Sequence, residues 1–462
     1  MFLAEAVFRI RQQSKTISYS ARHENSCVQG LKLTSEKPEA RSTVAALSRR
    51  VWSLRDEGAY SILERANHLD RHATSTADKI IHLEIGQPSA APPQHVVDAL
   101  INAVQSGETK YTDPAGTLKL REAICAYIER THQLKHGTLS PNMVVVGPGA
   151  KPGIALSCLA LLEPGDEVLV PDPGFPAYRA LIEVCGARAV TYTVSSEFGL
   201  LDPAEISAKI TQKTKLLILN SPSNPTGGVL SPKTLKELEH VLKSCGSDIW
   251  ILSDEIYARW FYEDRQIDDE AAGHVSIFCD DELRSRTILI DGLSKSFSMT
   301  GFRIGYAVAP AFLAERLRLL AVHIYGCVAN FTQSAATTAF VEQEKSDAYI
   351  RSLIEMYRRN RDLTYETLSI MKGCYLAKPQ GAFYAWLDVS AYGIPTPDLA
   401  RYLLEHGRVA VLPGTDFGSQ GEGFLRISFV CDQAELREGL GRLDIALRKI
   451  APSGIQQKLK QN

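Results

Sequence analysis

The sequence lacks the signs of several protein classes. No stretch approaches the roughly 18 apolar residues that a membrane-spanning helix needs. Lys and Arg number 51 and Asp and Glu number 53, so the net charge of −2 provides no basic surface for nucleic acid. The nine cysteines form no CxxC pair, and an odd, dispersed set in a chain of 462 residues is typical of reduced thiols inside a cell.

Motifs that bind metals are missing as well. The eleven histidines form no HExxH or HxH pattern. His68 and His72 lie four positions apart on an expected helix and could share a metal ion, but no third ligand is apparent and such a pair is more often solvated. We therefore expect no metal centre.

What is present is an ordinary globular composition, with 45% hydrophobic and 23% charged residues, enough for two or three packing units. The first 50 residues differ, because they carry nine Lys or Arg against four Asp or Glu. They are interpreted as a disordered extension or, less favoured, as an organelle-targeting leader. The expected location is the cytoplasm, or an organelle if the extension is a transit peptide.

Apolar runs alternate with amphipathic helical stretches beyond residue 51, and this alternation predicts βαβ units with a mostly parallel sheet. Strands are expected at 79–85, 143–146, 167–170, 216–219, 249–252, 287–290 and 304–308. Helices are expected at 61–72, 118–131, 151–162, 178–184, 232–243 and over most of 311–371.

The same pattern predicts a large and a small domain in one α/β chain. Residues 51–95 are expected to contribute to the small domain, 96–340 to form the large one, and 341–452 to complete the small one. An N-terminal extension at 1–50 and a tail at 453–462 flank them.

Ligands of an open α/β sheet bind at the carboxyl ends of its strands, so the loops that follow the strands are the places to look for chemistry. The loop 147–152 joins a strand to a helix, and its small residues would let backbone N–H groups reach a phosphate. It is neither a dinucleotide fingerprint, which needs glycine where Pro152 stands, nor a P-loop. By itself it is equally consistent with a tight turn.

Three further loops each have an ordinary explanation when taken singly. Residues 220–227 are explained as a proline-rich turn, Asp254 as an acid that caps a helix, and Lys295 as a solvent-exposed lysine. Lys295 nevertheless lies among small residues, with Arg303 eight positions on. Only the combination of these loops is specific.

In combination the loops resemble the fold-type-I pyridoxal 5′-phosphate (PLP) enzymes, specifically class I aminotransferases of the aspartate aminotransferase type. Residues 292–305, GLSKSFSMTGFRIG, are similar to the lysine signature of that family at every position. The family's other blocks follow in the same order, at 110–121, 149–151, 224–227, 254–257 and 424–428. The resemblance covers roughly residues 55–450 and implies a large PLP-binding domain, with a mostly parallel sheet flanked by helices, and a smaller α/β domain.

The resemblance also implies roles for individual residues. Lys295 would form the Schiff base with PLP and then move the proton at the substrate carbon, which requires a neutral amine for part of the time. Asp254 would keep the pyridine nitrogen protonated, so that the ring accepts electrons. Asn224 and Tyr257 would hydrogen-bond the 3′-oxygen, and Phe175 would stack on the ring.

The cofactor phosphate has its own expected partners. By resemblance they are Gly149, Ala150, Lys151, Ser294 and Arg303. An arginine suits this role because its planar fork binds phosphate through two hydrogen bonds. In the family Tyr111 reaches the phosphate of the neighbouring subunit, so the resemblance implies a homodimer with shared active sites.

The substrate α-carboxylate would be bound by Arg426, with Asn224 and the backbone of Gly86 nearby. Two positions depart from the family pattern. Gly292 stands where some relatives have a phosphate-binding serine, and Gln87 stands where many have glutamate.

The expected activity is transfer of the amino group of an L-amino acid to a 2-oxo acid, 2-oxoglutarate or pyruvate, in a ping-pong cycle. A PLP-dependent lyase or synthase on the same scaffold is the alternative. A non-catalytic PLP-binding regulator is a remote one, because the first 50 residues show no clear two-helix pattern. Lys151 is a candidate for a second carboxylate, which favours an aspartate-type substrate, unless Tyr325 and Phe331 line an apolar pocket instead. Neither nucleic acid nor a membrane is expected as a partner.

Overall fold

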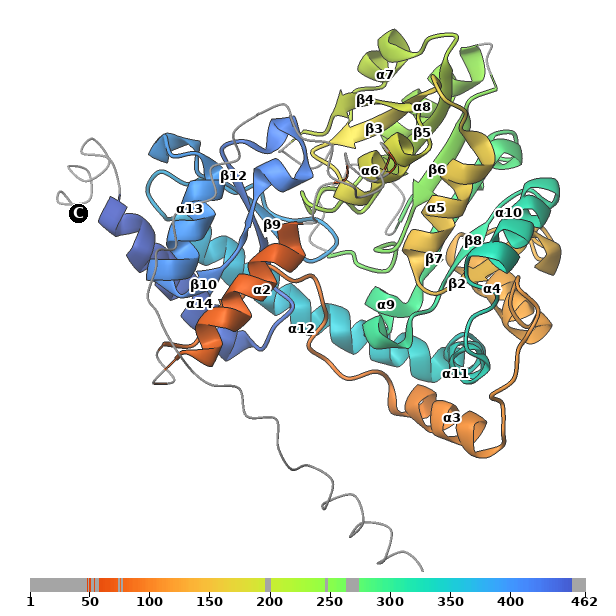
Figure 1. Cartoon of the computed structure of the whole chain (residues 1–462), viewed down its shortest axis with the longest axis horizontal. Helices are drawn as coiled ribbons and strands as arrows, with labels where there is room; N and C mark the ends of the chain where they lie inside the picture. Colours follow the sequence, from red (N-terminus) through yellow and green to blue (C-terminus); the bar gives the residue numbers. More distant parts are fainter. Residues whose placement is uncertain are drawn as a thin grey trace, which may run out of the picture. The chain divides into compact units, whose positions relative to one another are not determined.

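The computed structural model describes residues 48, 50, 54, 58–73, 75, 78–195, 201–245, 248–262 and 274–450. All described residues belong to one compact unit, which begins at Ser48 (Figure 1). The extension and the tail expected from the sequence lie outside the described residues, apart from residues 48 and 50. No helix among the described residues is both long enough and apolar enough to cross a membrane.

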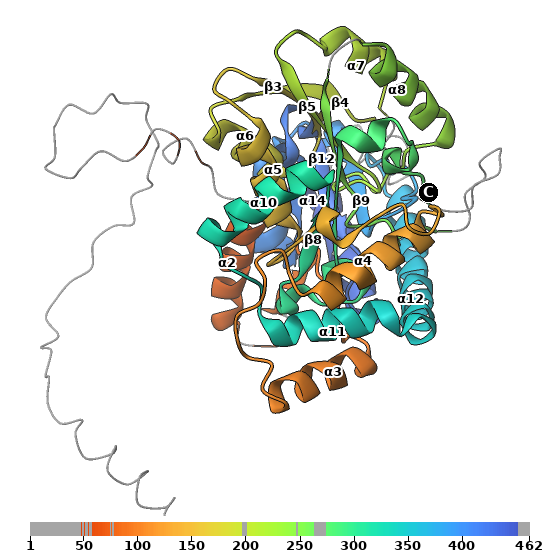
Figure 2. The ribbon, with the colours of Figure 1, turned by 90° about the vertical axis from the view of Figure 1, so that its right-hand side faces the viewer.

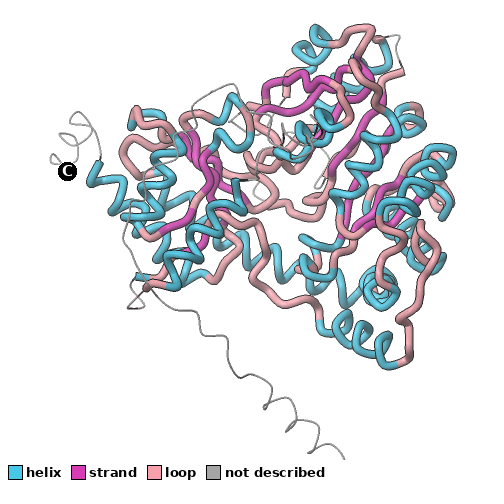
Figure 3. Tube along the Cα trace, in the orientation of Figure 1, coloured by secondary structure: helices cyan, strands magenta, loops and turns pink. Residues whose placement is uncertain are grey.

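A seven-stranded sheet is the centre of the fold, visible as the larger group of magenta strands in Figure 3. In spatial order its strands are β2 (Val144–Gly147), β8 (Gly305–Val308), β7 (Thr287–Gly292), β6 (Trp250–Asp254), β5 (Thr214–Asn220), β3 (Glu167–Asp172) and β4 (Arg188–Thr193). From β7 to β4 neighbouring strands are parallel, whereas β8 is antiparallel to both of its neighbours. The sheet is therefore mostly parallel, as expected, and mixed through the antiparallel β8.

Helices cover both faces of this sheet, which explains why its strands are apolar on both sides. Leu217 and Ile251 pack on one face, which is covered by α4 (Leu118–Thr131), α7 (Pro203–Lys209), α8 (Pro232–Ser244) and α11 (Asn330–Val341). Leu216 and Leu252 pack on the other, which is covered by α5 (Ala150–Leu161), α6 (Pro176–Val184) and α10 (Ala311–Ile324). Outside α11 lies α3 (Gln94–Gln105), as Figure 2 shows.

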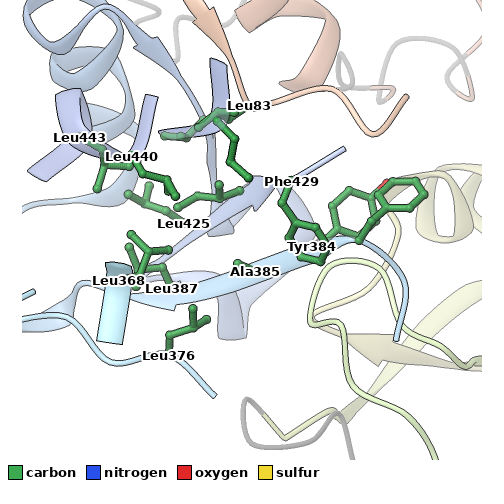
Figure 4. Close-up of a cluster of buried hydrophobic side chains, with 14 of the residues drawn as sticks. Leu83, Leu368, Leu376, Tyr384, Ala385, Leu387, Leu425, Phe429, Leu440 and Leu443 are labelled. Atoms are coloured by element: carbon green, nitrogen blue, oxygen red, sulfur yellow. The ribbon is translucent and has the colours of Figure 1, made fainter. Parts of the chain in front are cut away.

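A second core surrounds a small antiparallel sheet of β11 (Leu412–Pro413), β12 (Phe424–Ser428) and β9 (Tyr384–Asp388). Leu425 and Leu387 from this sheet pack with Leu440 of α14 (Gln433–Ile450), and with Leu83 (Figure 4). The remaining helices around it are α2 (Gly58–Arg71), the 27-residue α12 (Gln343–Ser369) and α13 (Thr396–Tyr402).

Most expected elements are present, with ends shifted by a few residues. The strand expected at 79–85 was wrong in extent: only β1 (Ile81–His82) is a strand, paired with β10 (Val409–Ala410). The N–H of Leu83 still reaches the carbonyl oxygen of Ala410, and its own carbonyl oxygen accepts from Ser428. Beyond Leu83 the chain leaves β10 and crosses to the end of the large sheet. The domain boundaries stay a prediction.

Candidate active site

The loops singled out from the sequence meet at one edge of the large sheet. In the parallel register Asn220 of β5 lies beside Asp254 of β6, and Asp254 lies beside Ile290 of β7. The loop that contains Asn224, the carboxylate of Asp254 and the lysine after β7 therefore start from neighbouring strand ends. This is the position in which an open α/β sheet binds a ligand.

Lys295 lies in α9 (Leu293–Ser296), a single helical turn that follows β7 directly. Its Nζ atom donates a hydrogen bond to the carbonyl oxygen of Gly86 at 2.7 Å and lies 5.7 Å from the ring centre of Phe383. Gly86 has little room, because a Cβ atom there would lie 2.0 Å from the hydroxyl oxygen of Tyr384. The lysine amine therefore lies between the backbone of Gly86 and the aromatic ring of Phe383.

Asp254, the last residue of β6, offers a buried carboxylate to the same space. Its Oδ2 atom accepts a hydrogen bond from the hydroxyl of Tyr178 at 2.6 Å, and Oδ1 accepts a long one of 3.4 Å from the N–H of Ile256. Burial raises the pKa of Asp254 to about 6. A cation placed against this carboxylate would reverse that shift, which is what a protonated pyridine nitrogen provides.

The N-terminus of α5 and Arg303 form a cradle suited to a phosphate. Gly149 precedes the helix at φ 101°, and a Cβ atom there would lie 2.4 Å from Nη2 of Arg303. The guanidinium is held by the carbonyl oxygens of Pro148, at 3.2 Å, and Thr300, at 2.8 Å. No side chain caps α5, so the amides of its first turn remain available for an acceptor such as a phosphate.

Two more predicted residues border this cradle. Ser294 is buried in α9, next to Lys295. Lys151 lies in the first turn of α5, and its Nζ atom is 5.0 Å from the ring centre of Phe175. The ring of Phe175 in turn meets the ring of Tyr178 edge to face at 5.5 Å.

Arg426 of β12 is buried, and its guanidinium is suited to bind an anion. Nη1 donates to Oδ1 of Asn224 at 2.9 Å, and Nη2 donates to the carbonyl oxygen of Glu84 at 2.5 Å. Its guanidinium carbon lies 4.3 Å from the ring centre of Tyr384. The buried Nε atom has no partner among the described residues, and a carboxylate ligand would satisfy it.

Tyr257 donates or accepts a hydrogen bond of 2.9 Å with the hydroxyl of Tyr384, and burial raises the pKa of Tyr257 well above its ordinary range. Tyr384 and Tyr178 contact the predicted residues directly, yet sequence reasoning did not single them out. Tyr384 lies in an ordinary strand and Tyr178 in an ordinary helix, so neither position carries a local signal.

Tyr111 is not gathered with the other predicted residues within the protomer. Its side chain is 97% exposed, in the loop that precedes α4. The position suits a residue that contributes to a neighbouring subunit, and this role stays a prediction.

A cavity of about 950 Å³ adjoins the site on the side of Phe175 and Lys151. Tyr325 and Asp416 line it too, and the buried Oδ2 atom of Asp416 has no partner within the described part of the chain. Phe331 is not among the residues that line this cavity, so its place in an apolar pocket stays a prediction. It lies in α11, which packs against α3 and α4 instead.

Together the fold and the site define a PLP-dependent enzyme of fold type I. Comparisons with known proteins agree. The profile of the family described as "Aminotransferase class I and II" matches residues 78–443. The "Probable N-acetyl-LL-diaminopimelate aminotransferase" of Bacillus subtilis (strain 168) is 38% identical over 374 residues, which are 80% of this chain and 90% of that protein. The "Aspartate aminotransferase" of Pyrococcus horikoshii is 33% identical over 402 residues, 85% of this chain and 99% of that one.

Solved structures give the same result. The aspartate aminotransferase from Thermus thermophilus with maleate is similar with a TM-score of 0.80 and 32% identity, covering 87% of this chain and 100% of that one. The chain belongs to the class I and II aminotransferase family and, within it, to the class I group that resembles aspartate aminotransferase. Enzymes of this class depend on PLP, and the cradle at α5, the buried carboxylate of Asp254 and the amine of Lys295 fit that cofactor.

Proposed function

We propose that this aminotransferase takes its amino group from an L-amino acid with an acidic side chain, of the aspartate type. The acceptor is 2-oxoglutarate or pyruvate, and the two half-reactions alternate in a ping-pong cycle. The observation that supports an acidic substrate is the Lys151 ammonium, which lines the cavity 5.0 Å from the ring of Phe175. A carboxylate at the far end of a substrate would pair with it there.

The names of the relatives support the same class of substrate. Relatives are named for N-acetyl-LL-diaminopimelate, aspartate and prephenate, and each of these compounds carries two carboxylates. One carboxylate would be bound by Arg426 together with Asn224, whose Oδ1 atom orients the guanidinium. The other would be bound by Lys151.

The residues at the site have separate roles in the reaction. PLP, when bound, supplies an electron sink for the carbon that carries the amino group. Asp254 holds positive charge at the pyridine nitrogen, and Tyr178 keeps its carboxylate oriented. Lys295 carries the proton to and from the substrate carbon, from a position fixed by the carbonyl oxygen of Gly86.

The remaining cofactor contacts follow from the cradle. The phosphate is held by Gly149, Ala150, the backbone of Lys151, Ser294 and Arg303. Phe175 stacks on the ring, and Tyr257 hydrogen-bonds the 3′-oxygen. We propose further that Tyr111, exposed in the protomer, completes the phosphate site of a second copy in a homodimer.

A panel of amino donors tests this proposal. Purified enzyme is given L-aspartate, L-glutamate and neutral amino acids of similar length, each with 2-oxoglutarate and with pyruvate. We expect acidic donors to give the highest kcat/KM, with a parallel-line pattern when both substrates are varied. Release of ammonia in the absence of an oxo acid would favour the lyase alternative instead.

A further inference from the structure

A buried group of side chains lies directly behind the end of β6. Glu255 is 1% exposed, and its Oε2 atom accepts hydrogen bonds from Nε2 of His132 at 2.8 Å and from Nε2 of His274 at 2.6 Å. Its Oε1 atom accepts from the hydroxyl of Ser253 at 2.7 Å and from that of Ser276. Four donors around one carboxyl group identify it as an ionised carboxylate.

The hydrogen bonds around His132 determine its protonation. We assign the hydroxyl proton of Thr131 to its hydrogen bond with the carbonyl oxygen of Tyr127 at 2.9 Å, the shortest of its contacts and one that threonines in helices commonly form. The same Oγ1 atom lies 3.1 Å from Nδ1 of His132 and can only accept there, so Nδ1 carries a proton. Nε2 carries another, because the carboxylate of Glu255 is only an acceptor. His132 is therefore a buried imidazolium.

His274 is the second histidine in contact with Glu255. Its Nε2 atom lies 2.6 Å from the Oε2 atom that also contacts His132. Glu255 and His132 therefore form a buried ion pair, with the ring of His274 at the same carboxylate oxygen.

The directions of the pKa shifts agree with an ion pair between His132 and Glu255. Burial by itself lowers the pKa of His132, but the hydrogen bond to Glu255 and its charge raise it overall. Burial by itself raises the pKa of Glu255, but the two histidine rings hold it well below its ordinary range.

Other ionisable groups face this pair from the neighbouring strands and loops. Burial raises the pKa of Asp254 to about 6 and that of Asp291, near the end of β7, to about 7, and the charge of Glu255 adds to both shifts. Tyr306 donates to Asp291 at 2.9 Å, and the thiol of Cys279, whose pKa burial raises to about 12, contacts the carbonyl oxygen of His132 at 3.6 Å. The charge of Glu255 therefore acts on both neighbouring carboxyl groups, and the charge of His132 acts on Asp291.

We propose that His132 is a positioning residue for the transamination: its buried positive charge neutralises Glu255, so that Asp254 keeps the negative charge that PLP requires. The inference rests on the proposed role of Asp254. Without His132, repulsion from Glu255 would favour the protonated form of Asp254, which no longer stabilises a cation. Removing Glu255 as well would remove that repulsion, so the two losses should compensate.

A metal ion is the competing explanation for the group. The possible ligand atoms of His132, Glu255 and His274 lie within 4.8 Å of one another. A metal would need to displace the protons that both rings place on Glu255, and the two serine hydroxyls already satisfy the other carboxylate oxygen. Metal content is therefore measured as one outcome of the test.

The first experiment measures the protonation of His132 in the holoenzyme with isotope-labelled histidine and NMR. At about pH 8 an ordinary histidine, with a pKa of about 6.5, is neutral. We expect one ring to keep both N–H protons there, and this signal to vanish in His132→Gln and to titrate normally in Glu255→Gln. A neutral His132 at that pH, or a stoichiometric metal ion in the purified protein, would overturn the proposal.

The second experiment measures the pH profile of the donor half-reaction. In His132→Gln the acidic limb should move up by about one pH unit, which lowers the rate about tenfold at pH values well below the midpoint of the limb and leaves alkaline rates near those of the unmodified enzyme. The double variant His132→Gln/Glu255→Gln should bring the limb back. His136→Gln is the matched control, since His136 is an exposed histidine that pairs with Glu129 at 3.2 Å near the same helix end.

The outcomes distinguish an electrostatic role of His132 from a purely structural one. If the double variant is more damaged than either single variant and its acidic limb does not recover, the group only stabilises the fold and the proposal fails. The NMR result on the unmodified enzyme decides the question even if a variant does not fold. An unmodified enzyme that transfers no amino group would refute the proposed function, whereas the protonation of His132 would still be measured.

Discussion

Replacing Arg426 by lysine perturbs the proposed carboxylate clamp while keeping its charge. The guanidinium spans Oδ1 of Asn224 at 2.9 Å and the carbonyl oxygen of Glu84 at 2.5 Å, and its planar face lies against Tyr384. An ammonium group is a point charge and cannot form two parallel hydrogen bonds to a carboxylate. Losing one hydrogen bond to a charged group costs about 1.5–3 kcal/mol, so kcat/KM for the donor should fall about 10- to 150-fold.

The assay follows the donor half-reaction in single turnovers, together with the absorbance of the bound cofactor. The absorbance should not change, because Arg426 lies on the substrate side of the site. Arg401→Lys is the control, since Arg401 is exposed in α13 and pairs with Asp398 at 2.6 Å. If KM and kcat of Arg426→Lys both stay within about twofold of the unmodified values, Arg426 is not the clamp.

Three further predictions follow from the same site. Burial raises the pKa of Asp254 to about 6, and a protonated carboxyl group cannot pair with a cation, so the affinity for PLP should fall as the pH drops through about 6. A PLP affinity that does not change with pH, or the same pH dependence in Asp254→Asn, would contradict this. Lys151→Ser should lower kcat/KM for acidic donors about tenfold and leave kcat/KM for neutral donors unchanged. Arg179→Ser alters another cation of the same cavity and should affect acidic and neutral donors alike. Equal losses for all donors in Lys151→Ser would reject the role of Lys151. Mixing inactive Tyr111→Ala and Lys295→Ala chains should restore activity through hybrid dimers with one intact site, and no recovery after demonstrated exchange would place Tyr111 in its own subunit's site.

Sequence reasoning located the residues that belong to continuous blocks. Gly149, Asp254 and Lys295 follow strands whose apolar runs are distinct. Strands β6 and β7 pair in parallel, and β2 runs in the same direction because β8, between β2 and β7, is antiparallel to both, so the carboxyl ends of the three strands lie at one edge. The alternating pattern likewise predicted βαβ units and a mostly parallel sheet, because strands buried on two sides have continuous apolar sequences. The antiparallel direction of β8 was not predicted.

Contacts between distant elements could not be predicted from the sequence. Tyr178 reaches Asp254 across 76 positions, and Tyr384 reaches Tyr257 across 127. Glu255 meets His132 across 123 positions, so the ion pair behind β6 depends on packing that no local pattern records. The strand at 79–85 was overestimated for a related reason: its later residues are apolar enough for a strand, but they cross to the active site instead of pairing with β10.

The central claim is that PLP is bound to the amine of Lys295 at the end of β7. The most direct measurement treats the purified holoenzyme with borohydride, which fixes the cofactor to its lysine, and maps the modified peptide by mass spectrometry. We predict a single modified peptide that contains Lys295, and none after Lys295→Ala. Modification of another lysine, such as Lys151 in the first turn of α5, would contradict the assignment.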